Sequence, residues 1–450
     1  MALFQKLDKQ HITIFMNQFI RQLRPFTVRR LFLCLLLPAL FFTSPGTATS
    51  KSLTVLTSFS EAPVKALVDD FVKQNPDVNV EIIYRRTLPA LRVLDHNRGM
   101  PVDVMMSSSP TFFNTLDKAG QLAPLPNLAM TPEWLQPHTL GLSKQVATIG
   151  YSGVGIMFNR RYLEKYNLPE PQHWQDLASP VWMGHVMMSA PSQSGTTHMM
   201  LENILQTFGW QKGWALIMQI GGNISSITAR SFGVSEGVTR GLAAAGLVVD
   251  SYAYNSQSRF SYIGFNYIPD SIILPTYFAI SRATKNRTTA ESFIHYLLSP
   301  AGQKIISTKE MRKMALTEPA LAQQHDFVTD QQLLFSREHV VNALFDQAIT
   351  QQLPKLRMAW ATIYQAEEIA KKNPANWRID LITKAREKAS QIPLDEAAAA
   401  KTNLLNNFSN IHDHQHLNPD AEKTMYQWRK QVEENLNQAI TFANQAMKSQ

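Results

Sequence analysis

Residues 187–197, MMSAPSQSGTT, pass from apolar side chains into a cluster of short hydroxylated ones around one Pro and one Gly. The apolar part predicts a buried strand over residues 184–189, and apolar residues at helical spacing predict a helix over residues 197–208. The hydroxyl-rich turn over residues 192–196 therefore lies between the end of a strand and the start of a helix. Such a turn places short hydrogen-bond donors beside the unpaired backbone N–H groups of the helix.

The same order of strand, hydroxyl-rich turn and helix recurs three more times along the chain. Its repetition is typical of an α/β fold with a parallel sheet. Further strands are predicted over residues 78–84 and 247–249. The other turns cover residues 57–60, 107–109 and 228–231. The first turn is followed by a helix predicted to begin at residue 60, the second by a helix over residues 111–118, and the third by a helix that ends at residue 240.

The four turns define a candidate anion-binding site, because ligands collect at the carboxyl ends of strands in open α/β sheets. Helix N-termini carry partial positive charge, and Arg230 would add a full charge and a fork for phosphate or carboxylate. Arg85 and Arg86 either reach this site or are solvated. A simpler interpretation of each turn is that its Ser only caps a helix. The candidate ligand-binding residues are Thr57, Ser58, Ser60, Ser107, Ser108, Ser109, Ser192, Ser194, Gly195, Thr196, Thr228, Arg230, Ser231, Asp250 and Tyr252.

Residues 1–50 have the features of an export signal. Arginines precede a leucine-rich apolar run over residues 31–42, and small residues follow where a signal peptidase would cleave. The run is too short to span a membrane. Arg29 and Arg30 also resemble a twin-arginine signal, but ordinary secretion is favoured. The protein is therefore predicted to act in the periplasm.

The composition of the exported part excludes several classes of function. The only cysteine, Cys34, lies in the export signal, so the mature chain is predicted to have no disulfide and no cysteine metal site. Six Lys and Arg residues and one Asp lie in residues 1–48, so the formal charge of +8 falls to about +3 after export. A charge so close to zero is not the footprint of a nucleic-acid-binding protein.

A series of short motifs follows in a fixed order along the middle of the chain. The motifs are GVGIMFN at 153–159, YL at 162–163, NLP at 167–169, WQDL at 174–177, PVWMG at 180–184, Pro191, SGT at 194–196, FI at 293–294 and LLSPAGQ at 297–303. Together they resemble the periplasmic solute-binding proteins of ABC importers, in the branch for iron(III) and phosphorylated sugars. The resemblance covers about residues 51–330.

The resemblance implies a two-lobed periplasmic-binding-protein fold of type II, which closes on a ligand by hinge motion and performs no reaction on it. Two extended segments with Gly or Pro nearby, residues 146–152 and 268–276, are suitable crossings between the lobes. The predicted division is residues 51–148 and 273–330 for lobe 1, residues 149–272 for lobe 2, and residues 331–450 for a helical C-terminal extension.

The resemblance leaves two classes of ligand open. Members that bind iron use adjacent tyrosines, but here Tyr252 and Tyr254 are separated by Ala253, which favours a phosphorylated or carboxylated organic anion over a ferric ion. No metal and no cofactor are expected. The long C-terminal part is similar to that of a regulatory member that responds to phosphoglycerate. The partners would therefore be a small anionic metabolite and an inner-membrane permease or sensor kinase, and the protein would act as a monomer.

Residues 331–450 contain no Gly and predict long helices. An interruption is expected at Pro354, and further helices are predicted over residues 375–389 and 420–448. One interpretation is that these helices pack on lobe 1 and stabilise it. The other is that they present a docking face to a membrane partner.

Two further interpretations remain open. A secreted phosphate-ester hydrolase would need a nucleophile with a base, and Ser194 could be the nucleophile, but the sequence assigns it no partner His. The chain also lacks the common sequence motifs of serine and zinc hydrolases. His412, His414 and His416 either hold a divalent ion or belong to a solvated loop.

Overall fold

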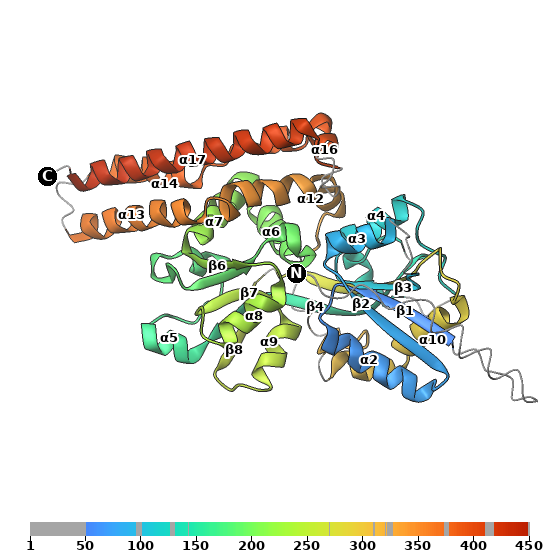
Figure 1. Cartoon of the computed structure of the whole chain (residues 1–450). Coiled ribbons are helices and arrows are strands. Elements are labelled where there is room, and N and C mark those ends of the chain that lie inside the picture. Colours follow the sequence, from blue (N-terminus) through green and yellow to red (C-terminus); the bar gives the residue numbers. More distant parts are fainter. Residues whose placement is uncertain are drawn as a thin grey trace, which may run out of the picture. The chain divides into compact units, whose positions relative to one another are not determined.

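The computed structural model describes residues 51–95, 101–126, 131–142, 144–269, 271–308, 311–319, 321, 327–372, 378–409 and 418–448 (Figure 1). The predicted export signal and the histidine cluster at residues 412–416 lie outside these ranges. Within them, no helix combines the length and the apolarity that crossing a membrane requires.

Lobe 1 is a small sheet covered by helices on both faces (Figure 1). Its elements are β1 (Lys51–Thr57), α2 (Glu61–Gln74), β2 (Val78–Tyr84), α3 (Thr87–Asp95), β3 (Val104–Ser107), α4 (Pro110–Lys118), η1 (Glu133–His138), β9 (Ile273–Ile280), α10 (Arg287–Leu298) and α11 (Pro300–Ser307). β1 lies between β2 and β3 and is parallel to both, while β9 is antiparallel to β3. The apolar residues Val64, Leu67 and Phe71 recur at helical spacing and bury α2 against this sheet.

Lobe 2 repeats the strand, turn and helix order. Its elements are the second half of β4 (Val146–Asn159), α5 (Arg160–Tyr166), η2 (Trp174–Ala178), η3 (Pro180–Trp182), β5 (Val186–Ser189), η4 (Pro191–Gln193), α6 (Gly195–Phe208), α7 (Trp210–Asn223), β6 (Ile224–Thr228), α8 (Ser231–Thr239), β7 (Ala245–Val249), α9 (Asp250–Gln257) and β8 (Ile263–Tyr267). β5 is parallel to β6 and β7. Tyr252 and Tyr254 lie on helix α9, which begins directly after β7.

The two lobes share the long strand β4. Residues 146–153 of β4 pair with β9, and residues 154–159 pair with β7 and β8, all antiparallel. The strand order is therefore β2-β1-β3-β9-β4-β7-β5-β6, with β8 also paired to β4. The predicted α/β class, the two-lobed arrangement and the helical C-terminal region are confirmed. The chain crosses between the lobes within β4 and again at the start of β9.

The C-terminal extension packs on lobe 2. Its elements are α12 (Gln331–Phe345), the π-helical turn η5 (Asp346–Thr350), α13 (Leu353–Lys372), α14 (Ile379–Ser390), α15 (Glu396–Ala399), α16 (Thr402–Ser409) and α17 (Pro419–Lys448). Helices α13, α14 and α17 lie side by side (Figure 1). Pro354 stands in the first turn of α13, where its missing N–H costs nothing, so the break in the helix falls at η5 instead.

The expectation that the extension stabilises lobe 1 is wrong. One continuous apolar core contains residues of lobe 2 together with residues of α12, α13, α14 and α17. The reason is a close approach between α7 and α13 that the absence of a side chain permits. A Cβ atom on Gly222 of α7 would lie 2.2 Å from Cδ1 of the fully buried Trp360. The hydroxyl of Tyr364, one turn further along α13, donates to the carbonyl of Ala178 at 3.0 Å.

Gly222→Ala is expected to lower the free energy of unfolding by about 1–3 kcal/mol, because the new methyl group overlaps the Trp360 ring in a packed core. The measurement is urea unfolding followed by tryptophan fluorescence and circular dichroism. Gly141→Ala is the matched control, since a Cβ there would meet no atom within 4 Å. Equal stability of the two variants would contradict tight packing of the extension on α7.

Candidate functional site

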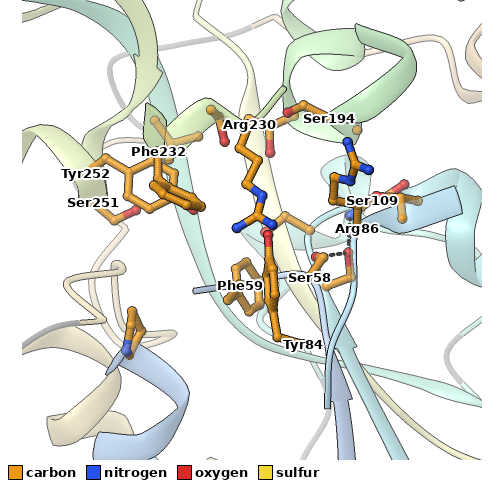
Figure 2. A pocket seen from close by; sticks show the side chains of 18 of the residues that line it. Ser58, Phe59, Tyr84, Arg86, Ser109, Ser194, Arg230, Phe232, Ser251 and Tyr252 are labelled. Atoms are coloured by element: carbon orange, nitrogen blue, oxygen red, sulfur yellow. Dashed lines mark hydrogen bonds between the residues drawn. The ribbon is translucent and has the colours of Figure 1, made fainter. Parts of the chain in front are cut away.

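A cleft between the two lobes collects most of the hydroxyl-rich turns. The candidate residues that line it are Ser58, Ser107, Ser108, Ser109, Ser194, Gly195, Thr196, Arg230, Ser231 and Tyr252. They come from the carboxyl ends of β1, β3, β5, β6 and β7 and from the helices that follow. Figure 2 shows that side chains from both lobes point into the same space.

Five candidate residues lie outside this lining and have other contacts. Thr57 is buried, and its hydroxyl accepts the backbone N–H of Phe59. Ser60 precedes α2 and faces a neighbouring groove. The remaining three bond within the protein: Ser192 to Asp346, Thr228 to the carbonyl of Arg230, and Asp250 to the backbone N–H of Gly153.

Two serines of the lining also cap helices. The Ser109 hydroxyl accepts the N–H of Phe112 in the first turn of α4, and the Ser194 hydroxyl accepts the N–H of Thr197 in α6, each at 3.3 Å. At both turns one residue therefore serves as the helix cap and as part of the cleft lining, because a cap places its oxygen at the positive end of the helix. Across the cleft floor, the hydroxyls of Ser58 and Ser107 lie 2.7 Å apart (Figure 2).

The charge of the lining is one-sided. Arg86, Arg230 and Lys313 line the cleft, whereas no carboxylate and no imidazole does so among the residues that the structure describes. Arg230 lies over the ring of Tyr84, with its guanidinium carbon 4.8 Å from the ring centre (Figure 2). Such a site attracts anions and repels metal cations.

Several of these contacts cross from one lobe to the other. Arg86 of lobe 1 donates from Nη1 to Oε1 of Gln193 in lobe 2 at 2.5 Å. Gly195, at the start of α6, lies so close to lobe 1 that a Cβ atom on it would be 2.8 Å from the Cβ of Ser109. The structure is therefore a closed form of the two-lobed protein.

The sequence did not indicate several residues of the lining. Tyr84, Phe232, Asn255 and Lys313 belong to no recognised motif, and Arg86 was left open. Lys313 lines the cleft because the chain returns to lobe 1 at β9 and, after α11, passes under the cleft. Its position depends on long-range packing, which no local pattern in the sequence could show.

Lys313 is a nearly fully buried amine on the floor of the cleft. Its Nζ donates to the hydroxyl of Ser152 at 3.1 Å and lies 4.9 Å from the centre of the Phe59 ring. Burial lowers the pKa of Lys313 to about 8, although the nearby carboxylate of Asp250 acts in the opposite direction. Burial likewise raises the pKa of Asp250 to about 6, even though it accepts hydrogen bonds from Gly153 and Tyr267.

Lys313 is expected to give the free energy of unfolding a pH dependence between about pH 8 and pH 10.5. In this window the unfolded chain keeps the proton that the folded chain has lost, so this group makes the protein more stable as the pH rises. Urea unfolding of the wild type and of Lys313→Met, at pH 7.5 and pH 9.5, measures the effect. The wild type should gain roughly 1–2 kcal/mol relative to the variant over this interval. Parallel pH profiles would show that Lys313 titrates normally.

Comparisons with known proteins agree with the two-lobed fold. The family profile of the bacterial extracellular solute-binding proteins matches residues 53–310. The phosphoglycerate transport regulatory protein PgtC of Salmonella typhimurium is 31% identical over 391 residues, which cover 85% of this chain and 94% of that protein. A protein of Haemophilus influenzae is 25% identical over 167 residues, which cover 35% of this chain and 45% of that protein.

Solved structures share the fold. The periplasmic binding protein AfuA from Actinobacillus pleuropneumoniae, with fructose-6-phosphate bound, superposes with a TM-score of 0.61 over 67% of this chain and 99% of its own, at 18% identity. The periplasmic binding protein P5PA superposes with a TM-score of 0.58 over 66% of this chain and 99% of its own, also at 18% identity. At this identity the likeness is one of fold.

Proposed function

The chain belongs to the bacterial extracellular solute-binding proteins, and on this premise we propose that it captures a small phosphorylated carboxylate of the phosphoglycerate type between its lobes. The observation that carries the proposal is the charge of the cleft: three cationic side chains line it, and no acidic side chain does so among the described residues. A ligand with negative charge at two positions would satisfy cations that come from different sides of the cleft.

The donor groups of the cleft suit an oxyanion. Arg230 offers a planar fork, which binds phosphate and carboxylate with two parallel hydrogen bonds. The start of α6 at Gly195 supplies backbone N–H groups and the positive end of the helix dipole beside Ser194 and Thr196. Phosphate at a helix N-terminus next to an arginine needs no metal ion to be held.

The choice of phosphoglycerate rests on one relative. PgtC, at 31% identity and with nearly its whole length matched, is named for phosphoglycerate transport regulation. The match extends beyond the residues of the family profile, so the relative has a comparable C-terminal part. A signalling role, in which the protein reports to a membrane sensor kinase, therefore fits as well as presentation of the ligand to a permease.

The cleft is a poor site for the alternatives. A ferric ion would be repelled by Arg86, Arg230 and Lys313, and burial raises the pKa of Tyr252 to about 12, so the phenol keeps its proton. The hydrolase interpretation needs a base beside Ser194, but its hydroxyl accepts a helix N–H and no His lines the cleft in the described part of the chain.

The ligand acts by closing the lobes. A hinge protein responds to its ligand only to the extent that the ligand binds the closed form more tightly than the open form. Closure would bring the rims of the two lobes into one surface that a membrane permease or kinase recognises. In this proposal the protein works as a monomer in the periplasm, after removal of the export signal at residues 1–50.

Calorimetric titration of the ligand-stripped protein with 3-phosphoglycerate, 2-phosphoglycerate, phosphoenolpyruvate, fructose 6-phosphate and ferric citrate tests the proposal. Tight binding of a phosphoglycerate is expected, and Arg230→Gln should weaken it by roughly 1–3 kcal/mol, the value of a hydrogen bond to a charged group. The control is Arg161→Gln, because Arg161 also lies over a tyrosine ring of lobe 2, that of Tyr262, but outside the cleft. Binding of ferric citrate alone would overturn the proposal.

Gly195→Val is expected to prevent closure while leaving the fold intact. Its side chain would overlap Ser109 of lobe 1 only when the lobes meet, so the open form bears no strain. Small-angle scattering with and without 3-phosphoglycerate should show a decrease in the radius of gyration for the wild type and no decrease for the variant. Gly141→Val, at an open position, is the control. Contraction of the variant would show that Gly195 and Ser109 lie further apart in the closed protein than they do in this structure.

A further inference from the structure

Helix α12 of the extension contacts both lobes. It packs against α6 and η4 of lobe 2 and also against α4 of lobe 1. It is also the first helix after the chain leaves lobe 1, so in the sequence it connects lobe 1 to the other helices of the extension (Figure 1). Any change in the distance between the lobes must therefore break or rearrange one of these two contacts.

The contact with lobe 2 is extensive and fixed. Arg337 donates to the carboxylate of Glu202 on α6 from Nε at 3.1 Å and from Nη2 at 2.8 Å, and both side chains are buried. One turn further along α12, Asn342 bonds to Nδ1 of His198 at 2.9 Å. The apolar side of α12 belongs to the core of lobe 2. Separating these groups would leave buried charges unpaired, which is strongly unfavourable.

The contact with lobe 1 is smaller and has an apolar and a polar part. Phe335 of α12 packs against an apolar cluster of lobe 1. Glu338, the residue after Arg337, hydrogen-bonds to the side chain of Thr111 in the first turn of α4 and also interacts electrostatically with His198 of α6. Thr111 in turn lies 3.0 Å, oxygen to oxygen, from the hydroxyl of Ser109, which lines the cleft. Glu338 and Thr111 are both buried in this closed form.

The direction of these hydrogen bonds follows from the charge of Glu338. In its ionised form Glu338 only accepts, so Thr111 then donates its proton to Glu338 and can receive the proton of Ser109. Ser109 then presents its oxygen to the N–H of Phe112, as a helix cap requires. A side chain of the extension thus holds the cap of α4, which is also a wall of the cleft.

We propose that Glu338 is a positioning residue of the ligand site: anchored to lobe 2 through α12, it binds Thr111 of lobe 1 in the closed form and holds Ser109 in place. The part of this inference that concerns the ligand rests on the proposed function, whereas the contact between Glu338 and Thr111 does not. Because the contact exists only when the lobes meet, it couples the closure of the lobes to the position of the extension. The free energy by which closure favours this position equals the free energy by which the position favours closure. A partner that holds the extension would therefore respond to the ligand.

The contact can be tested without a ligand by measuring the distance between the lobes. Spin labels at Lys73→Cys on α2 and Glu164→Cys on α5 of the mature protein, from which the export signal with Cys34 has been removed, report this distance by pulsed electron resonance. Both positions are exposed. The wild type should show a closed population, and Glu338→Ala should reduce it at least twofold. Glu338→Gln, which keeps an acceptor for Thr111, should restore it. Glu433→Ala, which removes an exposed ion pair with Lys355 of the same extension, is the matched control.

A double-mutant cycle on the affinity for 3-phosphoglycerate tests whether Glu338 acts through Thr111. Glu338→Ala and Thr111→Val should each raise the dissociation constant for 3-phosphoglycerate about fivefold, and the double variant should raise it no further, because both remove the same hydrogen bond. Independent effects would show that Glu338 acts through general stability. If the wild type binds no phosphoglycerate but Glu338→Ala still opens the lobes, the positioning role stands and the proposed ligand is wrong. Identical distances in the wild type and in Glu338→Ala, with and without ligand, overturn the inference.

Discussion

The two lobes are parts of one continuous sheet because the single strand β4 belongs to both. Its first half completes the sheet of lobe 1 and its second half completes that of lobe 2, so the lobes reorient about the residues between the two halves and about the paired start of β9. The pairing register shifts between Thr148 and Gly150, which marks an irregular point in the strand. Near this point Asp250 holds Gly153, and Lys313 holds Ser152. Lys313 thus both contacts the hinge strand and lines the cleft.

This arrangement places positive charge where the lobes meet. Arg86 comes from lobe 1, Arg230 from lobe 2, and Lys313 from the return segment below them. Closing the lobes brings these like charges together around one space, and no carboxylate in the described lining compensates Arg86 or Arg230. The closed form therefore has an electrostatic cost that an anion can offset. In the proposed function, selectivity for anions and ligand-dependent closure are consequently one property of the cleft.

Local patterns in the sequence predicted the elements but not all of their neighbours. The cap residues Ser109 and Ser194 were predictable, because strand, hydroxyl-rich turn and helix is a short-range pattern with a physical cause. The crossings near residues 146–152 and 268–276 were predicted on another basis, as extended segments with Gly or Pro nearby in a chain whose resemblance implied two lobes. Lys313 was not, since its place under the cleft comes from packing between distant segments. The side on which the extension packs was predicted wrongly, because it depends on the fit of Trp360 against Gly222, which no helical periodicity reveals.

The extension changes what closure means for this protein. In a two-lobed binding protein without an extension, closure changes only the arrangement of the two lobes. Here α12 is part of the core of lobe 2, so the helices attached to it move with that lobe as a body. Its contact with α4 is then made or lost with every closure, while the contacts of α13 with α7 remain. A surface far from the cleft therefore changes its position relative to lobe 1 when a ligand binds, which is what a membrane partner would need in order to sense the ligand.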